Sequence, residues 1–280
     1  MLKKGERLIR NFDKNDSQQL VNIWQICFGD KREYIESFFE RFGDSMKVGV
    51  YEEDGKIVSS LYCLEAELKF DGTSVKAWYL YAVATLPKFR KRGYASILIN
   101  EVKNAADGRR VLFLTPSNEE NRRFYEKLGF KDGCYSCVTE FKKTDKAANI
   151  ELRERKDESL FSGRENVLRE YPHVSWNEKH LDFAFNENTY LAFEGGREIG
   201  YFHYEKKDGK FVIDEICVEK DNVENVLNKA CEIFCCEKLK TATQYGENCC
   251  KISKGMIYCK FDSIKKEIGE NQFYLGANLE

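Results

Sequence analysis

The sequence KFRKRGYA, residues 88–95, determines how the N-terminal half of the chain can be interpreted. The segment before it, residues 78–85, is apolar and rich in aromatic and β-branched side chains, which predicts a buried strand closed by Pro87. The segment after it, residues 95–106, repeats apolar residues at three- and four-residue spacing, which predicts a helix that ends at Gly108. The basic stretch is therefore expected to be the turn between a strand and a helix.

This turn has the composition of a phosphate-binding loop. Gly93 allows the backbone to approach a ligand closely, and the first N–H groups of a helix have no partner within that helix. Arg90, Lys91 and Arg92 add positive charge on the same side of the glycine. Together these features predict a site for a polyanion such as a pyrophosphate. A solvated basic turn that binds no ligand would have the same residues. A second motif is therefore needed to distinguish the two interpretations.

The second motif lies downstream of the turn. Residues 111–114 predict another strand, and Ser117 and Glu120 have the spacing of a helix-capping box. The short helix that follows carries Asn121 and Tyr125 one turn apart and ends at a Gly-Phe pair. Asn121 and Tyr125 are therefore expected on one face of this helix.

The two motifs together resemble the signatures of the GNAT N-acetyltransferase superfamily. Arg90-x-x-Gly93-x-Ala95 is similar to the Arg/Gln-x-x-Gly-x-Gly/Ala turn that binds the pyrophosphate of acetyl-CoA in that superfamily. Asn121 and Tyr125, followed by Gly-Phe, are similar to its second signature, with a spacing that differs by one residue. The resemblance covers residues 1–143 and implies an acetyl-CoA-dependent N-acetyltransferase that acts on a primary amine of a small molecule or peptide.

The resemblance also implies which residues bind acetyl-CoA as co-substrate. Backbone groups of the strand before the turn would pair with pantetheine, and Asn121 would contact the pantetheine arm. The backbone N–H groups of the turn would bind the pyrophosphate. The expected strand residues are Val83, Ala84 and Thr85, and the expected turn residues are Arg90, Lys91, Arg92, Gly93, Tyr94, Ala95 and Ser96.

Acyl transfer to an amine further requires an acid for the leaving thiolate and a base for the amine. Tyr125 is the candidate acid because a phenol with a pKa of about 10 is protonated at neutral pH, although it could instead be a packed aromatic beside Phe124. Glu65 and Glu67 share a strand face and are candidate bases, but a solvated strand face has the same pattern. A water chain or the terminal carboxylate of Glu280 would serve equally well. All histidines lie in the second half of the chain.

The second half repeats the predicted order of elements at an offset of about 140 residues. At the position of the basic turn it has residues 218–222, which lack a glycine and include Glu219, and it has no Asn-to-Tyr helix. It therefore looks like a degenerate GNAT-like domain, as in tandem-GNAT proteins. With the polar run 142–146 as the boundary, the predicted domains are 1–143 and 150–280. The expected fold class is α/β (α+β), and each domain has a mixed, mostly antiparallel twisted sheet flanked by helices.

Composition limits the alternatives. The 45 basic and 47 acidic residues nearly cancel, so no nucleic-acid or anionic-membrane partner is expected. No segment has the pattern of an export signal or a membrane span, and we expect a cytoplasmic protein whose 11 cysteines are reduced thiols. No metal site is expected, because Cys134 and Cys137 would point to opposite faces of a strand.

Two other function classes remain open at this stage. The first is a module that binds or senses acyl-CoA without turnover, and the second is a scaffold role for the second half. The acceptor amine and the oligomeric state cannot be read from the sequence.

Overall fold

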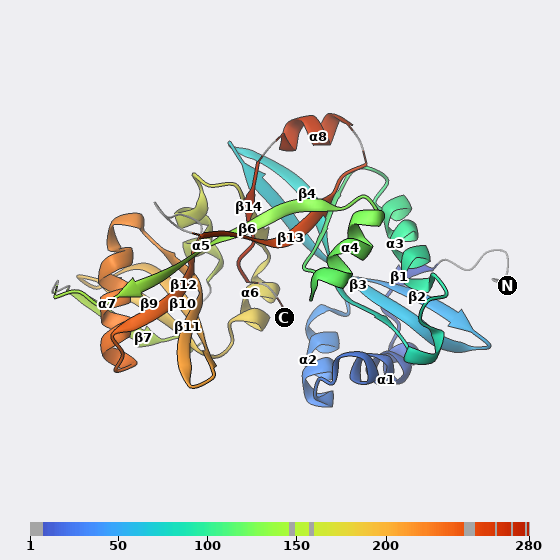
Figure 1. Cartoon of the computed structure of the whole chain (residues 1–280), viewed down its shortest axis with the longest axis horizontal. Coiled ribbons are helices and arrows are strands. Elements are labelled where there is room, and N and C mark those ends of the chain that lie inside the picture. Colours follow the sequence, from blue (N-terminus) through green and yellow to red (C-terminus); the bar gives the residue numbers. More distant parts are fainter. Residues whose placement is uncertain are drawn as a thin grey trace. The chain divides into compact units, whose positions relative to one another are not determined.

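The computed structural model describes residues 8–145, 149–156, 160–243, 250–260, 262–269, 271–277 and 279. The fold is mixed α/β, with mostly antiparallel strands flanked by helices (Figure 1). The chain divides into two compact units, each assembled from separate stretches of sequence. The first unit contains Met1–Glu67, Val75–Lys131 and Met256–Gly269, and the second contains Leu68–Ser74, Asp132–Gly255 and Glu270–Glu280.

The first unit has the strand order β1-β2-β3-β4-β5-β13. Strands β1 and β2, β2 and β3, and β5 and β13 pair antiparallel, whereas β4 and β5 pair parallel. The strands are β1 (Ile9–Asn11), β2 (Lys47–Glu53), β3 (Lys56–Phe70), β4 (Thr73–Thr85), β5 (Val111–Leu114) and β13 (Cys250–Tyr258). The helices are η1 (Lys14–Asp16), α1 (Ser17–Phe28), α2 (Arg32–Phe42), η2 (Pro87–Phe89), α3 (Tyr94–Ala105), α4 (Glu119–Lys127) and α8 (Asp262–Ile268).

Two sets of helices cover opposite faces of this sheet (Figure 1). Trp24 of α1 packs against Tyr62 of β3 and Tyr81 of β4, with ring centroids 5.1 and 5.5 Å apart. Leu98 of α3 and Tyr125 of α4 belong to the buried cluster on the other face. Side chains alternate along a strand, so one strand supplies both layers. The candidate site described below lies at one end of this sheet, which has helices packed on both faces.

Two Asp-Gly turns connect β2 to β3 and β3 to β4. Asp54 and Gly55 have φ values of +52° and +74°, and Asp71 and Gly72 have φ values of +46° and +72°. Two consecutive left-handed residues are typical of the type I′ turns that close hairpins.

The capping box predicted at Ser117 and Glu120 is wrong in detail. Asn118, not Ser117, caps α4, and its side-chain oxygen accepts from the backbone N–H of Asn121 at 2.8 Å. Asn177 caps α6 (Glu178–Ala184) in the same way. Asparagine is as good an N-cap as serine, so the neighbouring residue takes the role.

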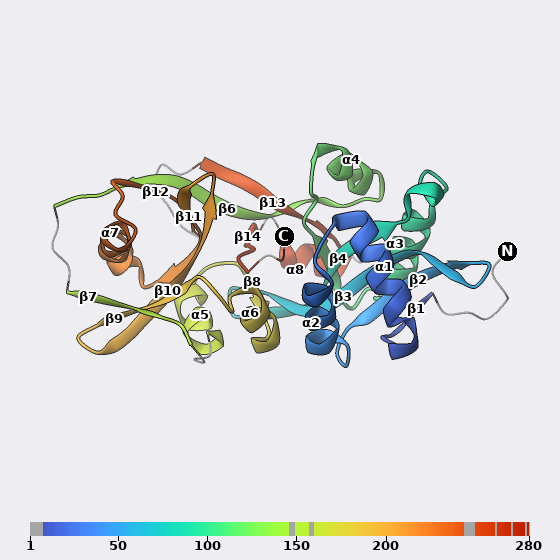
Figure 2. The same cartoon turned by 90° about the horizontal axis from the view of Figure 1, so that it is seen from below.

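The second unit has the strand order β6-β12-β11-β10-β9-β7, with β14 paired to β6 and β8. Its strands are β6 (Lys131–Lys142), β7 (Ile150–Glu154), β8 (His173–Trp176), β9 (Thr189–Glu194), β10 (Arg197–Lys207), β11 (Lys210–Val218), β12 (Lys238–Thr243) and β14 (Phe273–Tyr274). Its other helices are α5 (Phe161–Leu168), η3 (Lys220–Asn222) and α7 (Val223–Ile233). Helices α7 and α5 lie on opposite sides of the central strands (Figure 2). The parallel pair β11–β12 corresponds in order to β4–β5 of the first unit.

The last strand of the first unit comes from a different part of the chain than expected. The sequence predicts that residues 134–141 complete the N-terminal sheet, but β6 pairs with β12 in the second unit. Met256–Tyr258 of β13 pairs with β5 in its place. The two units therefore do not follow a single boundary near residue 143, because each takes strands from both halves of the sequence.

The cysteines differ from the expectation at one position. Nine described cysteines are free thiols, but Cys137 is disulfide-bonded. Within the residues that the structure describes, no group of three His, Cys, Asp or Glu side chains has the arrangement of a metal site. No helix in the described part of the chain has the length and hydrophobicity needed to cross a bilayer.

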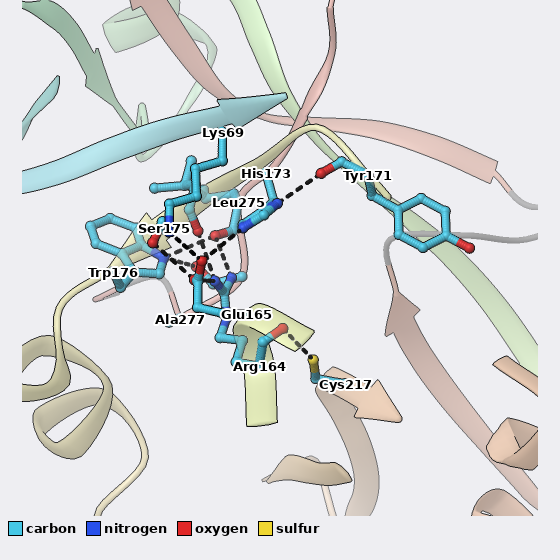
Figure 3. A network of polar contacts seen from close by, with 12 residues as sticks. Lys69, Arg164, Glu165, Tyr171, His173, Ser175, Trp176, Cys217, Leu275 and Ala277 are labelled. Atoms are coloured by element: carbon cyan, nitrogen blue, oxygen red, sulfur yellow. Dashed lines mark hydrogen bonds and ion pairs between the residues drawn. The ribbon is translucent and has the colours of Figure 1, made fainter. Parts of the chain in front are cut away.

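Figure 3 shows the polar network around Arg164, which forms a buried ion pair with Glu215 in the second unit. Arg164 is fully buried and donates to Glu215 at 3.0 Å, to the carbonyl of Val174 at 2.8 Å and to the carbonyl of Leu275 at 3.4 Å. Tyr201 donates to the same Glu215 carboxylate at 2.7 Å. The network thus connects α5 and β11 to the C-terminal segment. Breaking such a pair leaves a buried charge uncompensated.

Replacing Arg164 with Met should destabilise the protein by about 3 to 5 kcal/mol, because Glu215 is left buried without a cation. Urea unfolding followed by circular dichroism measures this change. The matched control is Arg197→Met, which removes a bidentate partner from the exposed Glu219 and should have a much smaller effect. Equal losses in the two variants would show that the buried network is not a principal source of stability.

Candidate functional site

The pairing between β4 and β5 ends before β4 reaches the residues that are expected to bind pantetheine. Pairing between the two strands is present from Ala77 opposite Val111 to Tyr79 opposite Phe113. Strand β5 then ends at Leu114, whereas β4 continues to Thr85. The side chains from Tyr81 to Val83 are only half-buried, although β4 is an internal strand. Ala82 has a φ of +45°, a left-handed conformation that is uncommon for alanine and interrupts the regular strand.

The end of β4 is held on its β3 side. The N–H of Leu86 donates to Val58 at 3.0 Å, and the Ser59 hydroxyl donates to the carbonyl of Ala84 at 2.7 Å. Backbone groups alternate sides along a strand, so those of Val83 and the N–H of Thr85 face away from β3. The Val83 backbone therefore lines the opening left by β5. Of the expected strand residues, Ala84 has its carbonyl already bound to the protein.

The turn after β4 presents backbone donors to solvent. Lys91 and Gly93 have φ values of +63° and +83°, and Gly93 is the N-cap of α3 with no side-chain cap. The first intrahelical bond runs from the N–H of Ile97 to the carbonyl of Gly93 at 3.0 Å, so the N–H groups of the first helical turn precede the helical ladder. A Cβ on Gly93 would meet no atom within 4 Å, which means that the space above the turn is open. Exposed backbone donors and open space are the features that an anion site requires.

The cations of the turn have different surroundings. The Arg90 side chain donates to the carbonyl of Thr85 at 3.1 Å, which fixes the turn to the end of β4. Arg92 lies 3.5 Å from Glu53 and stacks over the ring of Phe89 at 5.1 Å. Lys91 is exposed. The three side chains keep positive charge around the open helix terminus.

Tyr94 anchors the first turn of α3 to β2. Its ring stacks on that of Tyr51 with centroids 4.3 Å apart, and its hydroxyl donates to Glu53 at 3.3 Å. The Tyr94 side chain is therefore a structural support, while its backbone N–H remains in the position expected for phosphate binding. Ala95 and Ser96 follow in the same helical turn and are half-buried.

Asn121 lies in the first turn of α4 and is half-buried. Its side-chain amide donates to the Ser117 hydroxyl at 2.7 Å, which orients the amide beside the end of β5. One helical turn later, Tyr125 is 8% exposed. It packs with Phe124 and Phe130 at ring separations of 5.1 and 5.9 Å.

Tyr125 belongs to the same buried cluster as Leu80 and Leu114, the residues that follow the last β4–β5 pair. Its ring is thus placed near the fork between the strands. Burial raises the pKa of Tyr125 to about 12, so the phenol stays protonated at neutral pH. The structure is compatible with both sequence interpretations of Tyr125, as an acid and as a packed aromatic.

Lys103 of α3 connects α3 to the end of α4, near the point where β4 and β5 separate. Its ammonium group donates to the carbonyl of Leu128 and lies 4.1 Å from the centroid of the Tyr258 ring. Gly129 has a φ of +81°, and a Cβ there would lie 3.6 Å from Tyr258. The Gly-Phe end of the second motif is therefore fixed by a residue from the far C-terminal part of the sequence.

The candidate bases do not gain support from the structure. Glu65 accepts from the Trp78 indole at 2.8 Å and pairs with Arg110 at 3.5 Å, so its carboxylate has a structural role. Glu67 shares its face of β3, as predicted, and is half-buried. The terminal carboxylate of Glu280 lies outside the described residues. His173, His180 and His203 belong to the second unit.

Sequence reasoning missed one polar group beside β4. Asp30, between α1 and α2, accepts from the Trp24 indole at 2.7 Å. The hydroxyls of Tyr34 and Tyr81 lie 3.1 Å apart in the same aromatic layer. No motif marks these residues, because they come from separate elements. The one signal available was an acidic side chain directly after the helix-ending Gly29.

The corresponding turn of the second unit lacks the anion-site geometry. Helix η3 leads directly into α7, and no residue from Val218 to Val223 has a positive φ. Glu219 is paired with Arg197 at 2.5 Å. This segment therefore lacks the left-handed backbone and the glycine of the basic turn in the first unit.

Comparison with known proteins gives a match for the part that contains the site. Residues 8–132 match the family model described as Acetyltransferase (GNAT) domain. This stretch, which is less than half of the chain, is similar to a GNAT acetyltransferase domain. It spans β1 to α4 and so includes the open end of β4, the turn, Asn121 and Tyr125. No curated protein shows significant sequence similarity to the chain.

Solved structures share the fold over most of the chain. A probable N-acyltransferase of unknown function from Enterococcus faecalis V583 is 14% identical with a TM-score of 0.74, covering 90% of this chain and 72% of that one. A GCN5-related N-acetyltransferase from Anabaena variabilis is 16% identical with a TM-score of 0.73 and the same coverage, 90% and 72%. The Saccharomyces cerevisiae N-myristoyltransferase with bound myristoyl-CoA is 9% identical with a TM-score of 0.56, covering 92% and 84%. At these identities the likeness concerns the fold.

Gly93→Glu should abolish acetyl-CoA binding. The substitution forces a side chain into a left-handed position and places a negative charge in the open space above the turn. Calorimetric titration with acetyl-CoA measures the loss. Gly209→Glu, at another left-handed glycine with open space around it, is the matched control and should bind normally. Normal affinity in a folded Gly93→Glu variant would exclude the turn from the binding site.

Proposed function

We propose that the protein is an acetyl-CoA-dependent N-acetyltransferase that transfers the acetyl group to a primary amine of a small molecule or peptide. The observation that carries this proposal is the continuity of the open end of β4 with the left-handed turn at the start of α3, within the residues that match a GNAT acetyltransferase domain. An extended amide-containing arm followed by a pyrophosphate fits this path in shape and in hydrogen-bonding groups.

In this proposal acetyl-CoA would bind as an additional strand-like partner of β4. The backbone groups of Val83 and the N–H of Thr85 would pair with the pantetheine amides, with Ala84 between them bound on its other side to Ser59. The N–H groups of the turn would bind the pyrophosphate, assisted by the exposed cations of Arg90, Lys91 and Arg92. Asn121 would contact the pantetheine arm from α4.

The chemistry needs placement of the two substrates, a proton donor for the leaving thiolate and a proton acceptor for the amine. The neutral amine nitrogen attacks the thioester carbon, the intermediate expels the CoA thiolate, and the proton lost from nitrogen passes to water. Tyr125 would donate to that thiolate. Because the pKa of Tyr125 is about 12, full proton transfer to a thiolate with a pKa of about 8.5 is uphill by roughly 5 kcal/mol. The hydroxyl therefore acts chiefly through a hydrogen bond that strengthens as charge develops on sulfur.

Tyr125→Phe should lower kcat by about one to three orders of magnitude while the dissociation constant for acetyl-CoA changes little. The ring and its packing are preserved, so the loss reports the missing hydroxyl. Release of free thiol from acetyl-CoA in the presence of amines measures turnover. A Phe variant with the parental kcat would show that Tyr125 is a packed core aromatic.

The pH dependence gives an independent check on Tyr125. A general acid is lost as the pH rises through its pKa, so an ordinary tyrosine would cause activity to fall around pH 10. With a pKa of about 12, Tyr125 should remain protonated through pH 10. The fall in kcat at alkaline pH should therefore occur above pH 10. This fall should be absent in the Phe variant. The two profiles are measured under saturating substrate.

The second unit would be a degenerate GNAT-like domain without a cofactor. Support comes from the shared strand order and from the parallel β11–β12 pair that matches β4–β5. The turn after β11 has no left-handed residue and carries Glu219 where the first unit has its cations. We therefore infer one acetyl-CoA site per chain.

A non-catalytic module that binds or senses acyl-CoA is the second candidate. The observation in its favour is that Glu65 is held by Trp78 and Arg110, which leaves the site in the described residues without an evident base. Both functions require acetyl-CoA binding, but only the enzyme releases thiol when an amine is added. Binding without amine-dependent thiol release would favour the module.

A further inference from the structure

The half-buried stretch of β4 has an acidic group beside it. Tyr81, the first residue of that stretch, contacts Trp24 with ring centroids 5.5 Å apart. The Trp24 indole N–H donates to Asp30 at 2.7 Å, and the Tyr81 hydroxyl lies 3.1 Å from that of Tyr34. The Trp24 side chain thus contacts both the Asp30 carboxylate and the ring of Tyr81, whose hydroxyl meets that of Tyr34.

Asp30 is not paired with a cation among the residues that the structure describes. It is half-buried, and within the described part of the chain no lysine, arginine or histidine forms an ion pair with it. The neighbouring Arg32 forms an ion pair with Glu36 at 3.4 Å and donates a hydrogen bond to Gln18 at 3.0 Å. Lys31 is exposed. A half-buried carboxylate that is bound by one neutral indole donor keeps its negative charge and lone pairs for another cation.

The two tyrosines can bind a cation but cannot deprotonate it. Burial raises the pKa of Tyr34 and also that of Tyr81, and the negative charge of Asp30 acts in the same direction on both. Their hydroxyls therefore remain protonated at neutral pH. One hydroxyl donates to the other, and a phenol oxygen can accept a hydrogen bond from an ammonium group.

We propose that Asp30, with the hydroxyls of Tyr34 and Tyr81, forms the binding site for the protonated amine of the acceptor, which makes the acceptor a cationic alkylamine. This inference rests on the proposed function, because it assigns the acceptor side of the same reaction. The ammonium group binds beside the opening of β4, loses its proton to water, and then attacks the thioester. Phe28, which is 48% exposed and lies 6.2 Å from the Trp24 ring, provides an apolar surface for the rest of such a molecule.

Charge selectivity is the property that distinguishes this site from a purely apolar one. Benzylamine is a cation at neutral pH, and benzyl alcohol has nearly the same shape without the charge. Hydrogen bonds to charged groups are worth more than those to neutral ones, so the CoA-saturated protein should bind benzylamine about tenfold or more tightly than benzyl alcohol. Calorimetric titration of the two probes measures this ratio.

Asp30→Asn should remove the selectivity. The asparagine oxygen can still accept from the Trp24 indole, so the local packing is retained while the charge is lost, and near-ultraviolet circular dichroism checks this. The affinity for benzylamine should fall about tenfold and that for benzyl alcohol should not change. Glu33→Gln, which removes an exposed carboxylate from the first turn of α2, is the matched control and should leave both affinities unchanged.

A second variant covers the case in which Asp30→Asn does not fold. Tyr34→Phe keeps the ring and removes one hydroxyl of the pair, and it should weaken benzylamine binding by about threefold to tenfold without affecting the alcohol. Equal affinity of the parent protein for amine and alcohol would overturn the proposal, as would unchanged benzylamine binding in both variants. Failure of CoA itself to bind would instead overturn the proposed function, so the two failures are separable.

Discussion

The separation of β4 from β5 is the structural constraint on which the proposed site depends. An internal strand normally pairs on both edges, and a buried backbone group without a partner costs free energy. Here β4 continues past the end of β5 with half-buried side chains and with Ala82 in a left-handed conformation. Such a conformation costs on the order of 1 kcal/mol or more and persists where the surrounding structure enforces it. Ser59 binds the carbonyl of Ala84 from the β3 side, and Arg90 binds the carbonyl of Thr85 at the strand end, which leaves the backbone of Val83 and the N–H of Thr85 for an external chain.

The parts of the site that the sequence predicted are those built from consecutive residues. The turn from Arg90 to Ser96 needs a strand, a glycine and a helix in immediate succession, and each has a local signal. Gly93 has a positive φ, and α3 begins at the next residue. The capping box at Ser117 failed because Asn118 competes with that serine for the same local bond. The sequence pattern could not choose between two adjacent residues of similar capping strength.

Features that depend on distant segments were not predictable in the same way. The pairing of β13 with β5, and of β6 with β12, is decided by which strands can bury each other, and no local pattern records that choice. Asp30 is a similar case, because its importance comes from Trp24 of α1 and Tyr81 of β4 meeting in one aromatic layer. In the second unit, the same strand order surrounds a buried Arg164–Glu215 pair rather than an open turn. The shared order of strands therefore does not by itself imply a shared ligand.

Amide hydrogen exchange with and without acetyl-CoA tests the central claim most directly. If acetyl-CoA pairs with β4 and binds at the start of α3, the amides of Val83, Thr85 and residues 93–96 should exchange more slowly in its presence. The amides of the corresponding segment of the second unit, residues 217–223, should be unaffected. Protection confined to the second unit, or no protection at 83–96 under saturating acetyl-CoA, would contradict the account.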